Sequence, residues 1–350
     1  MATIVLTGGG TAGHCIPHLA LLPYLKNDFD KIYYIGSTTG LEKNIIEGEN
    51  IEFFSIPCVK LKRSFSIDNF AIPFKLLSSI HQAGKILDKL KPDVVFSKGG
   101  YVSIPTVIAS HKRKIPVICH ESDYSMGLAN KISARYCKKI LTSFPDTVLE
   151  NKKCQYVGSP IRRDLFNVSK ISALQKFNLS GDKPILLITG GSQGATTINT
   201  VVRGALDQLL KDFDVVHICG KGNLDNSIDK KGYKQFEFIS NIQDAFAIAS
   251  VCVTRAGSNT LFELLSLSIP SVLIPLPKGA SRGDQIENTN YFSKLGVVTS
   301  LPQENLTEKS LIYSIYSTFS NKDIIKKNLS LHPIRDCSRQ ISRIIADYKH

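Results

Sequence analysis

The stretch that decides the fold occurs twice in this chain. Ile4-Val5-Leu6-Thr7-Gly8-Gly9 is an apolar run followed by a glycine turn, and Leu186-Leu187-Ile188-Thr189-Gly190-Gly191 repeats it. A helical pattern follows each copy, then Asp-Phe-Asp at 28–30 and 212–214, and then a second strand pattern. Internal similarity of this kind indicates two copies of one architecture. The sequence therefore predicts an α/β protein with two Rossmann-like, doubly wound domains.

Working outward, short β-rich runs alternate with helix-length segments, the spacing of parallel βαβ units. The predicted strands are Thr3–Thr7, Lys31–Ile35, Ile51–Ile56, Asp93–Ser97, Pro116–Cys119, Ile185–Thr189, Val215–Cys219, Gln235–Ile239, Val251–Thr254 and Ser271–Ile274. An isoleucine stripe predicts a terminal helix over Ile334–Ala346 that packs back across the domains. Gly158-Ser159-Pro160 marks the hinge. We expect one domain at 1–160 plus 334–350, on the acceptor and membrane side, and a donor domain at 161–333.

Composition excludes several classes of protein. With 350 residues, 43% hydrophobic and 21% charged, the chain is too apolar to be disordered and too long for one core. No two of the eight cysteines lie closer than 17 residues, which excludes a zinc knuckle and favours free thiols in a reducing cytosol. Neither an export signal nor an apolar run long enough to span a bilayer is present, so we expect any membrane contact to be peripheral.

The net charge of +13 is concentrated in part on one stretch, because residues 59–90 hold six Lys or Arg against two Asp. Bulky apolar residues are interleaved there, a combination that indicates docking on an anionic bilayer surface. The residues assigned to this role are Lys60, Lys62, Arg63, Phe65, Phe70, Phe74 and Lys75. The alternative is that the apolar members are core of a βα connection.

The first glycine turn, Gly8–Gly13, matches the dinucleotide pattern G-x-G-x-x-G. A nicotinamide site also needs Asp or Glu where the second strand ends, and this strand ends Ile35-Gly36-Ser37, which argues against a dehydrogenase. Both glycine turns open helices, so both can offer backbone N–H groups and a helix N-terminus to an anion. The alternative is that the glycines only permit tight strand-to-helix packing.

Three polar motifs carry the candidate chemistry. His14 follows the first turn at a helix N-terminus, where we expect a lowered pKa and a neutral imidazole suited to general-base catalysis, with a structural hydrogen bond as the alternative. Glu263 has capping-box spacing from Thr260, and its alternative role is a carboxylate that binds ribose hydroxyls. The two Asp-x-Asp motifs precede strands, on the edge opposite to where ligands bind, so no metal site is expected.

Taken together and in order, these motifs resemble those of one known family. Gly9-Gly10-Thr11-Ala12-Gly13-His14, Gly99-Gly100-Tyr101-Val102-Ser103, His120-Glu121, Gly158–Arg162, Gly190–Gly194, Arg255-Ala256-Gly257 with Glu263, and Asp284-Gln285 resemble the bacterial UDP-N-acetylglucosamine:lipid I N-acetylglucosaminyltransferases, the MurG family. The resemblance covers essentially the whole chain. It implies the GT-B fold, with a cleft between the domains, and inverting transfer of N-acetylglucosamine to the 4-hydroxyl of the muramyl sugar of lipid I, giving lipid II for peptidoglycan.

The resemblance also implies roles for single residues. Thr11, Ala12 and Gly13 match the first loop near donor and acceptor, Arg162 and Ser192 match diphosphate contacts, Ile239 a uracil contact, Glu263 the ribose ligand and Gln285 a sugar-hydroxyl contact. Ser258, Thr260, Leu261 and Asp123 complete the donor set. His14 is the candidate base, followed by Glu121 and Tyr101. Ala12 stands where the family often has Gly, and Asp123 where some members have Asn.

The implied partners are UDP-N-acetylglucosamine, polyprenyl-diphosphate-linked lipid I and an anionic membrane, at the cytoplasmic face of the cell membrane, with no cofactor and no metal. The nearest alternatives are a diacylglycerol glycosyltransferase and a sugar-nucleotide 2-epimerase. Nucleic-acid binding is suggested by charge alone, and the sequence has no helix-turn-helix, RRM or zinc pattern, so no nucleic acid is expected.

Overall fold

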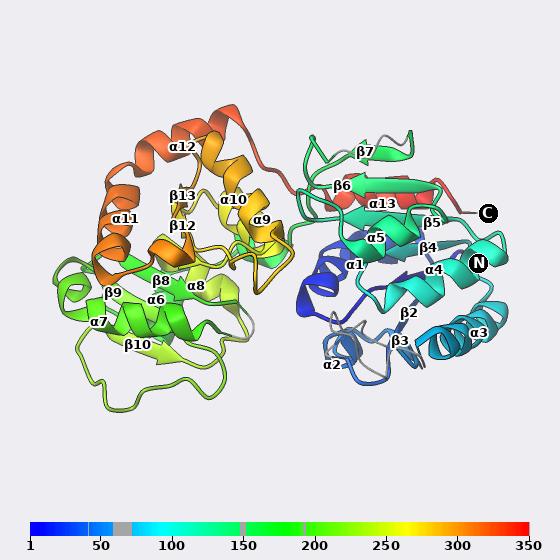
Figure 1. Cartoon of the computed structure of the whole chain (residues 1–350), viewed down its shortest axis with the longest axis horizontal. Helices are drawn as coiled ribbons and strands as arrows, with labels where there is room; N and C mark the ends of the chain where they lie inside the picture. Colours follow the sequence, from blue (N-terminus) through cyan, green and yellow to red (C-terminus); the bar gives the residue numbers. More distant parts are fainter. Residues whose placement is uncertain (41, 59–71, 148–151, 192–193, 350) are drawn as a thin grey trace. The chain divides into compact units, whose positions relative to one another are not determined.

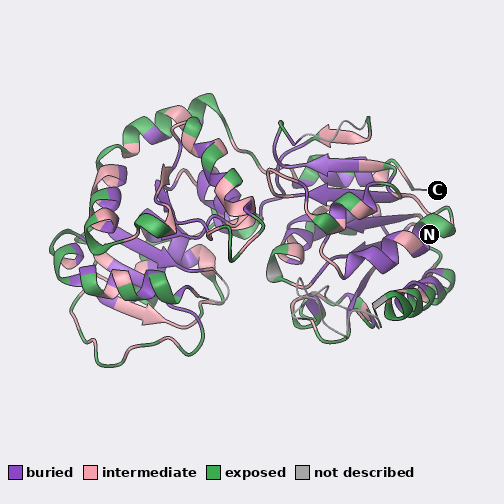
Figure 2. Ribbon diagram, viewed as in Figure 1, coloured by how far each residue is buried: buried purple, intermediate pink, exposed green. Residues whose placement is uncertain are grey.

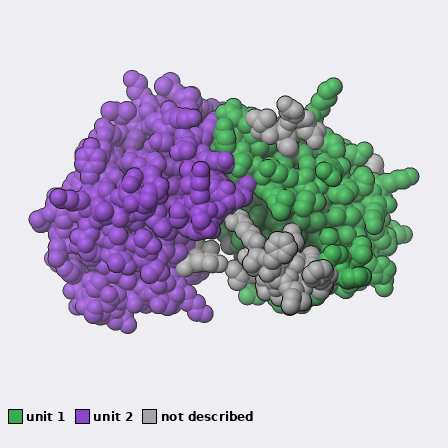
Figure 3. All heavy atoms as spheres, viewed as in Figure 1, with its two compact units in different colours: residues 1–162, 336–350 green, residues 163–335 purple. Residues whose placement is uncertain are grey.

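The computed structural model describes residues 1–40, 42–58, 72–147, 152–191 and 194–349. The chain divides into two compact units, coloured separately in Figure 3. Unit 1 comprises Met1–Arg162 and Asp336–His350, and unit 2 comprises Arg163–Arg335. Each unit is described below by itself.

Unit 1 contains a fully parallel sheet of seven strands in the order β3-β2-β1-β4-β5-β6-β7. Its strands are β1 (Thr3–Thr7), β2 (Lys31–Ser37), β3 (Glu52–Ile56), β4 (Val94–Ser97), β5 (Val117–Glu121), β6 (Lys139–Thr142) and β7 (Cys154–Tyr156). Its helices are η1 (Ala12–His14), α1 (Ile16–Asp28), α2 (Glu42–Glu47), α3 (Ile72–Leu90), α4 (Ser103–Lys112), α5 (Leu128–Ser133) and α13 (Ser338–Ala346). The order reverses on either side of β1, as in a doubly wound sheet (Figure 1).

Unit 2 repeats the plan with a fully parallel sheet of six strands, in the order β10-β9-β8-β11-β12-β13. Its strands are β8 (Ile185–Thr189), β9 (Asp214–Ile218), β10 (Tyr233–Phe236), β11 (Ala249–Thr254), β12 (Ser271–Leu273) and β13 (Thr299–Ser300). Its helices are η3 (Arg163–Phe166), α6 (Lys170–Lys176), α7 (Thr196–Asp212), α8 (Ile242–Ile248), α9 (Ser258–Ser266), α10 (Asp284–Lys294), η4 (Gln303–Asn305), α11 (Glu308–Ser320) and α12 (Lys322–Leu331).

The central strand β1 shows why the sheets are buried on both faces (Figure 2). Ile4 and Leu6 belong to one apolar cluster, together with residues of α1 and α13. Val5, which points the other way, belongs to a second cluster that includes residues of α3 and α4. Alternation along one strand thus supplies two cores, which explains its unbroken apolar sequence.

The predicted fold class, two doubly wound parallel α/β domains, is confirmed. Most of the other strand bounds differ from prediction by one or two residues, and two of the larger differences have a clear physical cause. β10 ends at Phe236 and not at Ile239, because its partner strand β9 ends at Ile218. The last hydrogen bond between these two segments runs from the Cys219 backbone N–H to the Phe236 carbonyl oxygen. Helix α13 begins at Ser338 and not at Ile334, after Pro333, and the Asp336 carboxylate accepts bonds from the Ser338 and Ile161 backbone N–H groups. The helix packs against α1 of unit 1.

Candidate active-site residues at the two sheet edges

The first glycine turn leaves the carboxyl end of β1 and packs directly against the turn that follows β4. A Cβ atom on Gly100 would lie 2.2 Å from the Gly9 carbonyl oxygen, and one on Gly10 would lie 2.4 Å from the Tyr101 ring. Both glycines also have left-handed φ values, +79° and +87°. Only glycine satisfies both requirements, so these residues bring the two turns into contact.

His14 ends the short helix η1 and stands just before α1. Its Nδ1 lies 2.9 Å from the Thr11 hydroxyl, and its side chain is half-buried between exposed neighbours, Thr11 and Gly13. When Nδ1–H donates to Thr11, a neutral imidazole keeps Nε2 as a proton acceptor. The predicted base therefore has a partner that can select the required tautomer.

Glu121 ends β5 and is 5% exposed. Its Oε1 accepts from the backbone N–H groups of Ser122 and Asp123, and its Oε2 accepts from Gly127 N and the Asn130 amide, at 2.9–3.0 Å. Burial raises the pKa of the Glu121 carboxyl and Asp123 reinforces this, while these hydrogen bonds lower it. The carboxylate thus fixes the shape of the loop after β5.

Lys98, which follows β4, is a buried cation that the sequence analysis did not identify. Its side chain is 2% exposed, and its Nζ lies 2.6 Å from His120 Nδ1 and 2.6 Å from Ser122 Oγ. Burial lowers the pKa of Lys98 to about 7, against the opposing effect of Glu121 and Asp123. The only sequence signal was one lysine between an apolar strand and a glycine pair.

Glu42, the first residue of α2, is a second functional candidate that the sequence analysis missed. The side chain is fully buried and accepts bonds from Ser37 N, the Ser37 hydroxyl and, at 3.4 Å, Gly10 N. A Cβ atom on Gly9 would lie 2.7 Å from this carboxylate. The first glycine turn therefore contacts a buried carboxylate. The dinucleotide pattern expects a carboxylate at the end of the second strand, and Glu42 lies five residues beyond the end of β2.

In unit 2, the second glycine turn leaves the carboxyl end of β8 and enters α7. Gly194 has a φ of +74°, and a Cβ atom there would lie 2.3 Å from the Cys219 carbonyl oxygen. The turn thus fits closely against the backbone at the end of β9. Ser192, the predicted diphosphate contact, lies outside the described residues.

Helix α9 tests the capping-box interpretation of Glu263. The N-cap is Gly257 without any side-chain cap, so Thr260 lies inside the first turn and Glu263 in the second. The capping-box alternative is therefore wrong. Glu263 is 8% and Ser258 9% exposed, and Thr260 is half-buried. The Leu261 side chain is fully buried, so Leu261 can contact a ligand only through its backbone.

The remaining predicted donor residues also follow strand ends. Ile239 is half-buried in the loop between β10 and α8. Gln285 lies in the first turn of α10, where its Oε1 accepts from Leu276 N at 3.1 Å, which orients the amide. Arg162 is the last residue of unit 1 before the chain enters unit 2, and it is half-buried.

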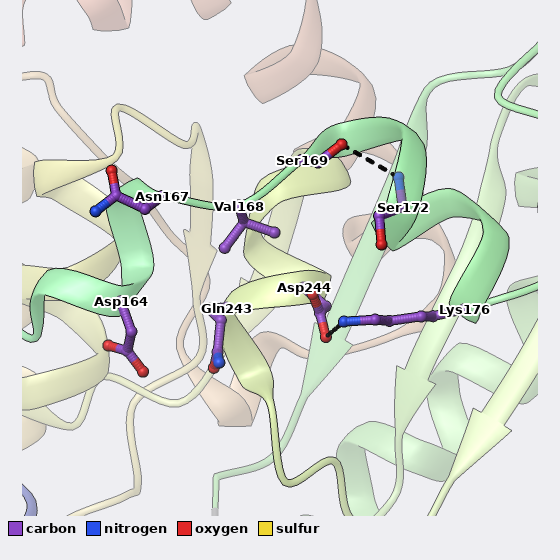
Figure 4. A pocket seen from close by; sticks show the side chains of 8 residues that line it. All are labelled: Asp164, Asn167, Val168, Ser169, Ser172, Lys176, Gln243 and Asp244. Carbon is purple, nitrogen blue, oxygen red and sulfur yellow. Dashed lines mark hydrogen bonds and ion pairs between the residues drawn. The ribbon is translucent and has the colours of Figure 1, made fainter.

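Two pockets lie within the units, and neither is lined by a predicted donor residue. One of about 340 Å³ in unit 2 lies between η3, α6 and α8, where Lys176 and Asp244 form an ion pair of 2.8 Å (Figure 4). The other, of about 330 Å³ in unit 1, is lined by Cys58, Thr38 and Lys75 among others.

The predicted membrane stretch is described only from residue 72 onward. Lys60, Lys62, Arg63, Phe65 and Phe70 lie outside the described residues. On α3, Phe74 is 77% and Leu77 60% exposed, and Lys75 is exposed beside them. The core alternative is therefore wrong for Phe74. None of the helices in the described part of the chain is long and apolar enough to cross a bilayer.

The described residues contain no group of three or more metal-ligating side chains placed to hold an ion. The Asp-x-Asp residues have other partners at the amino ends of strands. Asp28 lies near Lys349 of the terminal segment, at 3.4 Å, and Asp212 accepts from the Tyr316 hydroxyl at 2.6 Å. Asp30 accepts from Ala2 N at 2.7 Å.

Comparison with known proteins identifies the family. Residues 4–142 match the glycosyltransferase family 28 N-terminal domain, and residues 185–340 match the family 28 C-terminal domain. The chain belongs to glycosyltransferase family 28. Family 28 membership makes this chain a glycosyltransferase, which confirms the predicted enzyme class.

Relatives extend this result over the whole length. A protein of Clostridium botulinum strain Alaska E43, named UDP-N-acetylglucosamine--N-acetylmuramyl-(pentapeptide) pyrophosphoryl-undecaprenol N-acetylglucosamine transferase, is 50% identical over 91% of this chain and 90% of its own. A Lachnospira eligens protein of the same name is 46% identical over 99% of both chains. The predicted resemblance to this subfamily of family 28 is confirmed.

Solved structures agree on the fold. The crystal structure of Acinetobacter baumannii MurG superposes with a TM-score of 0.79 at 23% identity, covering 99% of this chain and all of that one. The kitacinnamycin glycotransferase gives a TM-score of 0.72 at 14% identity over 99% of both chains. The predicted GT-B class, two α/β domains in one chain, is thereby confirmed.

Proposed function

We propose that this family 28 enzyme transfers N-acetylglucosamine from UDP-N-acetylglucosamine to the muramyl sugar of an undecaprenyl-diphosphate-linked acceptor, giving lipid II for peptidoglycan. The observation that carries the proposal is the likeness, at 44–50% identity over nearly the full chain, to relatives whose names state this reaction. The relatives' names supply donor and acceptor. Residues at the carboxyl edges of the two sheets supply the donor binding and the proton transfer.

Unit 2 supplies most of the donor contacts, and Arg162, the last residue of unit 1 before the chain enters unit 2, supplies another. The glycine turn after β8 directs α7 at the diphosphate, and the helix N-terminus stabilises the negative charge that develops as UDP departs. Arg162 adds a charge-assisted hydrogen bond to the diphosphate, as does the Ser192 hydroxyl. Glu263, which the geometry of α9 frees from a capping role, accepts from the two ribose hydroxyls. Ile239 contacts the uracil, and Gln285 a hydroxyl of the donor sugar.

Unit 1 binds the acceptor and moves the proton. The acceptor 4-hydroxyl oxygen forms a bond to the anomeric carbon while the bond from that carbon to the diphosphate oxygen breaks, which inverts the configuration. His14 Nε2 takes the hydroxyl proton, and Thr11 holds the other ring nitrogen. The four hydrogen bonds accepted by Glu121 favour a positioning role for it over proton transfer. Tyr101 covers the turn at Gly10.

The enzyme works as a peripheral protein at the cytoplasmic face of the membrane, where a polyprenyl-linked acceptor resides. The exposed Phe74 and Leu77 beside Lys75 support contact with the acyl boundary and with anionic headgroups. The sequence holds further basic and aromatic residues at 60–70, just before α3.

The test is a transfer assay with purified protein, radiolabelled UDP-N-acetylglucosamine and a soluble lipid I analogue. The expected product is a lipid-linked disaccharide. Parallel reactions contain diacylglycerol in place of the acceptor, or no acceptor at all. Label on diacylglycerol, or conversion of the donor sugar without transfer, would overturn the proposal in favour of one of the related UDP-sugar enzymes.

A further inference from the structure

The motif Arg255-Ala256-Gly257 contributes to the family resemblance, and the proposed function gives its arginine no task. Arg255 directly follows β11, at the carboxyl edge of the sheet of unit 2, and it is 9% exposed. Burying a guanidinium group is costly unless its N–H groups are hydrogen-bonded. The acceptors of these N–H groups therefore indicate what the buried arginine does.

The Arg255 guanidinium joins the ends of three neighbouring strands. Its Nη1 donates to the Ile274 carbonyl oxygen at 3.1 Å and to the Pro275 carbonyl oxygen at 3.4 Å, both just after β12. Its Nη2 donates to Gln303 Oε1 at 2.6 Å, on η4 after β13. β11, β12 and β13 are adjacent in the sheet. The two nitrogens of a planar fork thus hold two separate loops, an arrangement that the compact ammonium group of a lysine does not reproduce.

The loop after β12 orients the Gln285 side chain. In Pro275-Leu276-Pro277 only Leu276 has a backbone N–H group, because a proline nitrogen carries no hydrogen. That N–H group donates to Gln285 Oε1 at 3.1 Å. An N–H group can only donate, so the oxygen of the Gln285 amide faces the loop, and Nε2 is the end that donates to other groups. The position of Leu276 therefore fixes the orientation of the amide.

Helix α10, which carries Gln285, has anchors of its own. The fully buried Asn288 donates from its amide to the Ala256 carbonyl oxygen at 3.3 Å. The Thr289 hydroxyl donates to the Gln285 carbonyl oxygen within the helix. The loop at 274–275, in contrast, accepts two hydrogen bonds from the guanidinium of Arg255. Loss of the guanidinium is therefore expected to loosen the loop and to leave the helix in place.

We propose that Arg255 is a positioning residue for recognition of the donor sugar, which holds the loop after β12 so that the Leu276 N–H group orients the Gln285 amide. The inference rests on the proposed function, in which Gln285 contacts a hydroxyl of the donor sugar. It adds to that function an arginine that acts through the amide and not by its own contact with the sugar. A change at Arg255 therefore affects the binding of UDP-N-acetylglucosamine more than the binding of UDP, which lacks the sugar.

The first experiment is a double-mutant cycle that measures the donor KM in the transfer assay. Gln285→Ala is expected to raise this KM about fivefold, the effect of one lost hydrogen bond. Arg255→Lys, which keeps the charge without the fork, is expected to raise it by about the same factor. Because both changes act on one amide, the double variant is expected at about fivefold and not at about twenty-fivefold. The affinity for UDP, measured by calorimetry, is expected to stay at the native value in all three variants.

Two results of this cycle would overturn the inference. Additive effects of Arg255→Lys and Gln285→Ala would show that the arginine does not act through the amide. A loss of UDP affinity in Arg255→Lys as large as the rise in the donor KM would assign the arginine to the nucleotide site or to general stability. Arg339→Lys, at an exposed arginine of α13, is the matched control and is expected to behave like the native protein.

The second experiment measures hydrogen exchange of the loop without substrate. It follows the Leu276 amide in the native protein, in Arg255→Lys and in Gln303→Met, which keeps the arginine and removes the acceptor of its Nη2. Exchange at Leu276 is expected to be about tenfold faster or more in both variants. The internal control is the Cys252 amide, which donates to the Pro270 carbonyl oxygen at 2.9 Å, and its exchange is expected to stay at the native rate. Unchanged exchange at Leu276, or equal acceleration at both amides, would overturn the role of the guanidinium.

The two experiments separate the inference from the proposed function. If the native enzyme transfers no sugar to the lipid I analogue, the proposed function fails, and hydrogen exchange still decides whether the guanidinium holds the loop. If transfer occurs and the cycle is additive, the function stands and the role of Arg255 is lost.

Discussion

The two glycine turns share a sequence pattern and differ in what surrounds them. The turn in unit 1 rests on the Glu42 carboxylate, backs onto Lys98 and leads into His14. The turn in unit 2 rests on the Cys219 backbone. The nearby His217 is buried, with its two ring nitrogens 2.9 Å from the Tyr233 hydroxyl and 3.0 Å from Asn199 Oδ1, and burial lowers its pKa to about 3. One βα turn therefore suits proton transfer, and the other suits holding an anion.

The largest effect is expected at the turn of unit 1. His14→Ala removes the proposed base, so kcat is expected to fall by ~10²–10⁴ while UDP binding to unit 2 is little changed. Steady-state kinetics and UDP titration measure the two quantities. His81→Ala, at an exposed histidine of α3, is the control. If His14→Ala kept near-native turnover, His14 would not be the base, and the two glycine turns would no longer differ in their chemistry.

The second largest effect concerns the membrane surface, which the sequence assigns to unit 1. Lysine near an anionic leaflet contributes about 1 kcal/mol, so replacing Lys60, Lys62 and Lys75 by Glu is expected to weaken liposome binding about a hundredfold or more. The control reverses Lys309, Lys326 and Lys327, which are exposed in unit 2. Equal co-sedimentation of both triple variants with anionic liposomes would show that docking does not depend on this stretch.

The donor side is tested by Glu263→Ala in unit 2. Loss of the ribose ligand is expected to raise the donor KM more than tenfold, since two hydrogen bonds to a charged group are lost. The melting temperature measures the structural cost separately. Glu304→Ala, an exposed glutamate of the same unit, is the control. A lower melting temperature with an unchanged KM would make Glu263 a structural residue.

The fold could be predicted from sequence because both sheets have continuous apolar strands, and β1 and β8 match their predicted bounds. The short strands β6, β7 and β13 were not predicted, since none of them has more than two consecutive aliphatic residues. The glycine turns and His14 could be found by their motifs. Lys98 and Glu42 could not, because their burial comes from packing between segments far apart in the chain.

A smaller effect is expected for the partner of the base. Thr11→Val removes the hydroxyl that lies 2.9 Å from His14 Nδ1, and one lost hydrogen bond of about 1 kcal/mol corresponds to about a fivefold fall in kcat. Thr11→Ser keeps a hydroxyl and is expected to retain most of the rate. If serine and valine variants were equally slow, the hydroxyl would not orient His14.

The smallest effect is expected at the Asp-x-Asp motifs, where the two units are alike. Asp28 and Asp212 each end a helix before a strand, at the amino edge of the sheet, and their carboxylates contact Lys349 and the Tyr316 hydroxyl. Ligands of open α/β sheets bind at the opposite, carboxyl edge. Transfer by Asp28→Asn and Asp212→Asn is therefore expected at the native rate, and the native rate is expected to persist in excess chelator. A rate abolished by chelator and restored by magnesium would place a metal among the groups that stabilise the departing diphosphate, and the helix N-terminus of unit 2 would no longer suffice for that task.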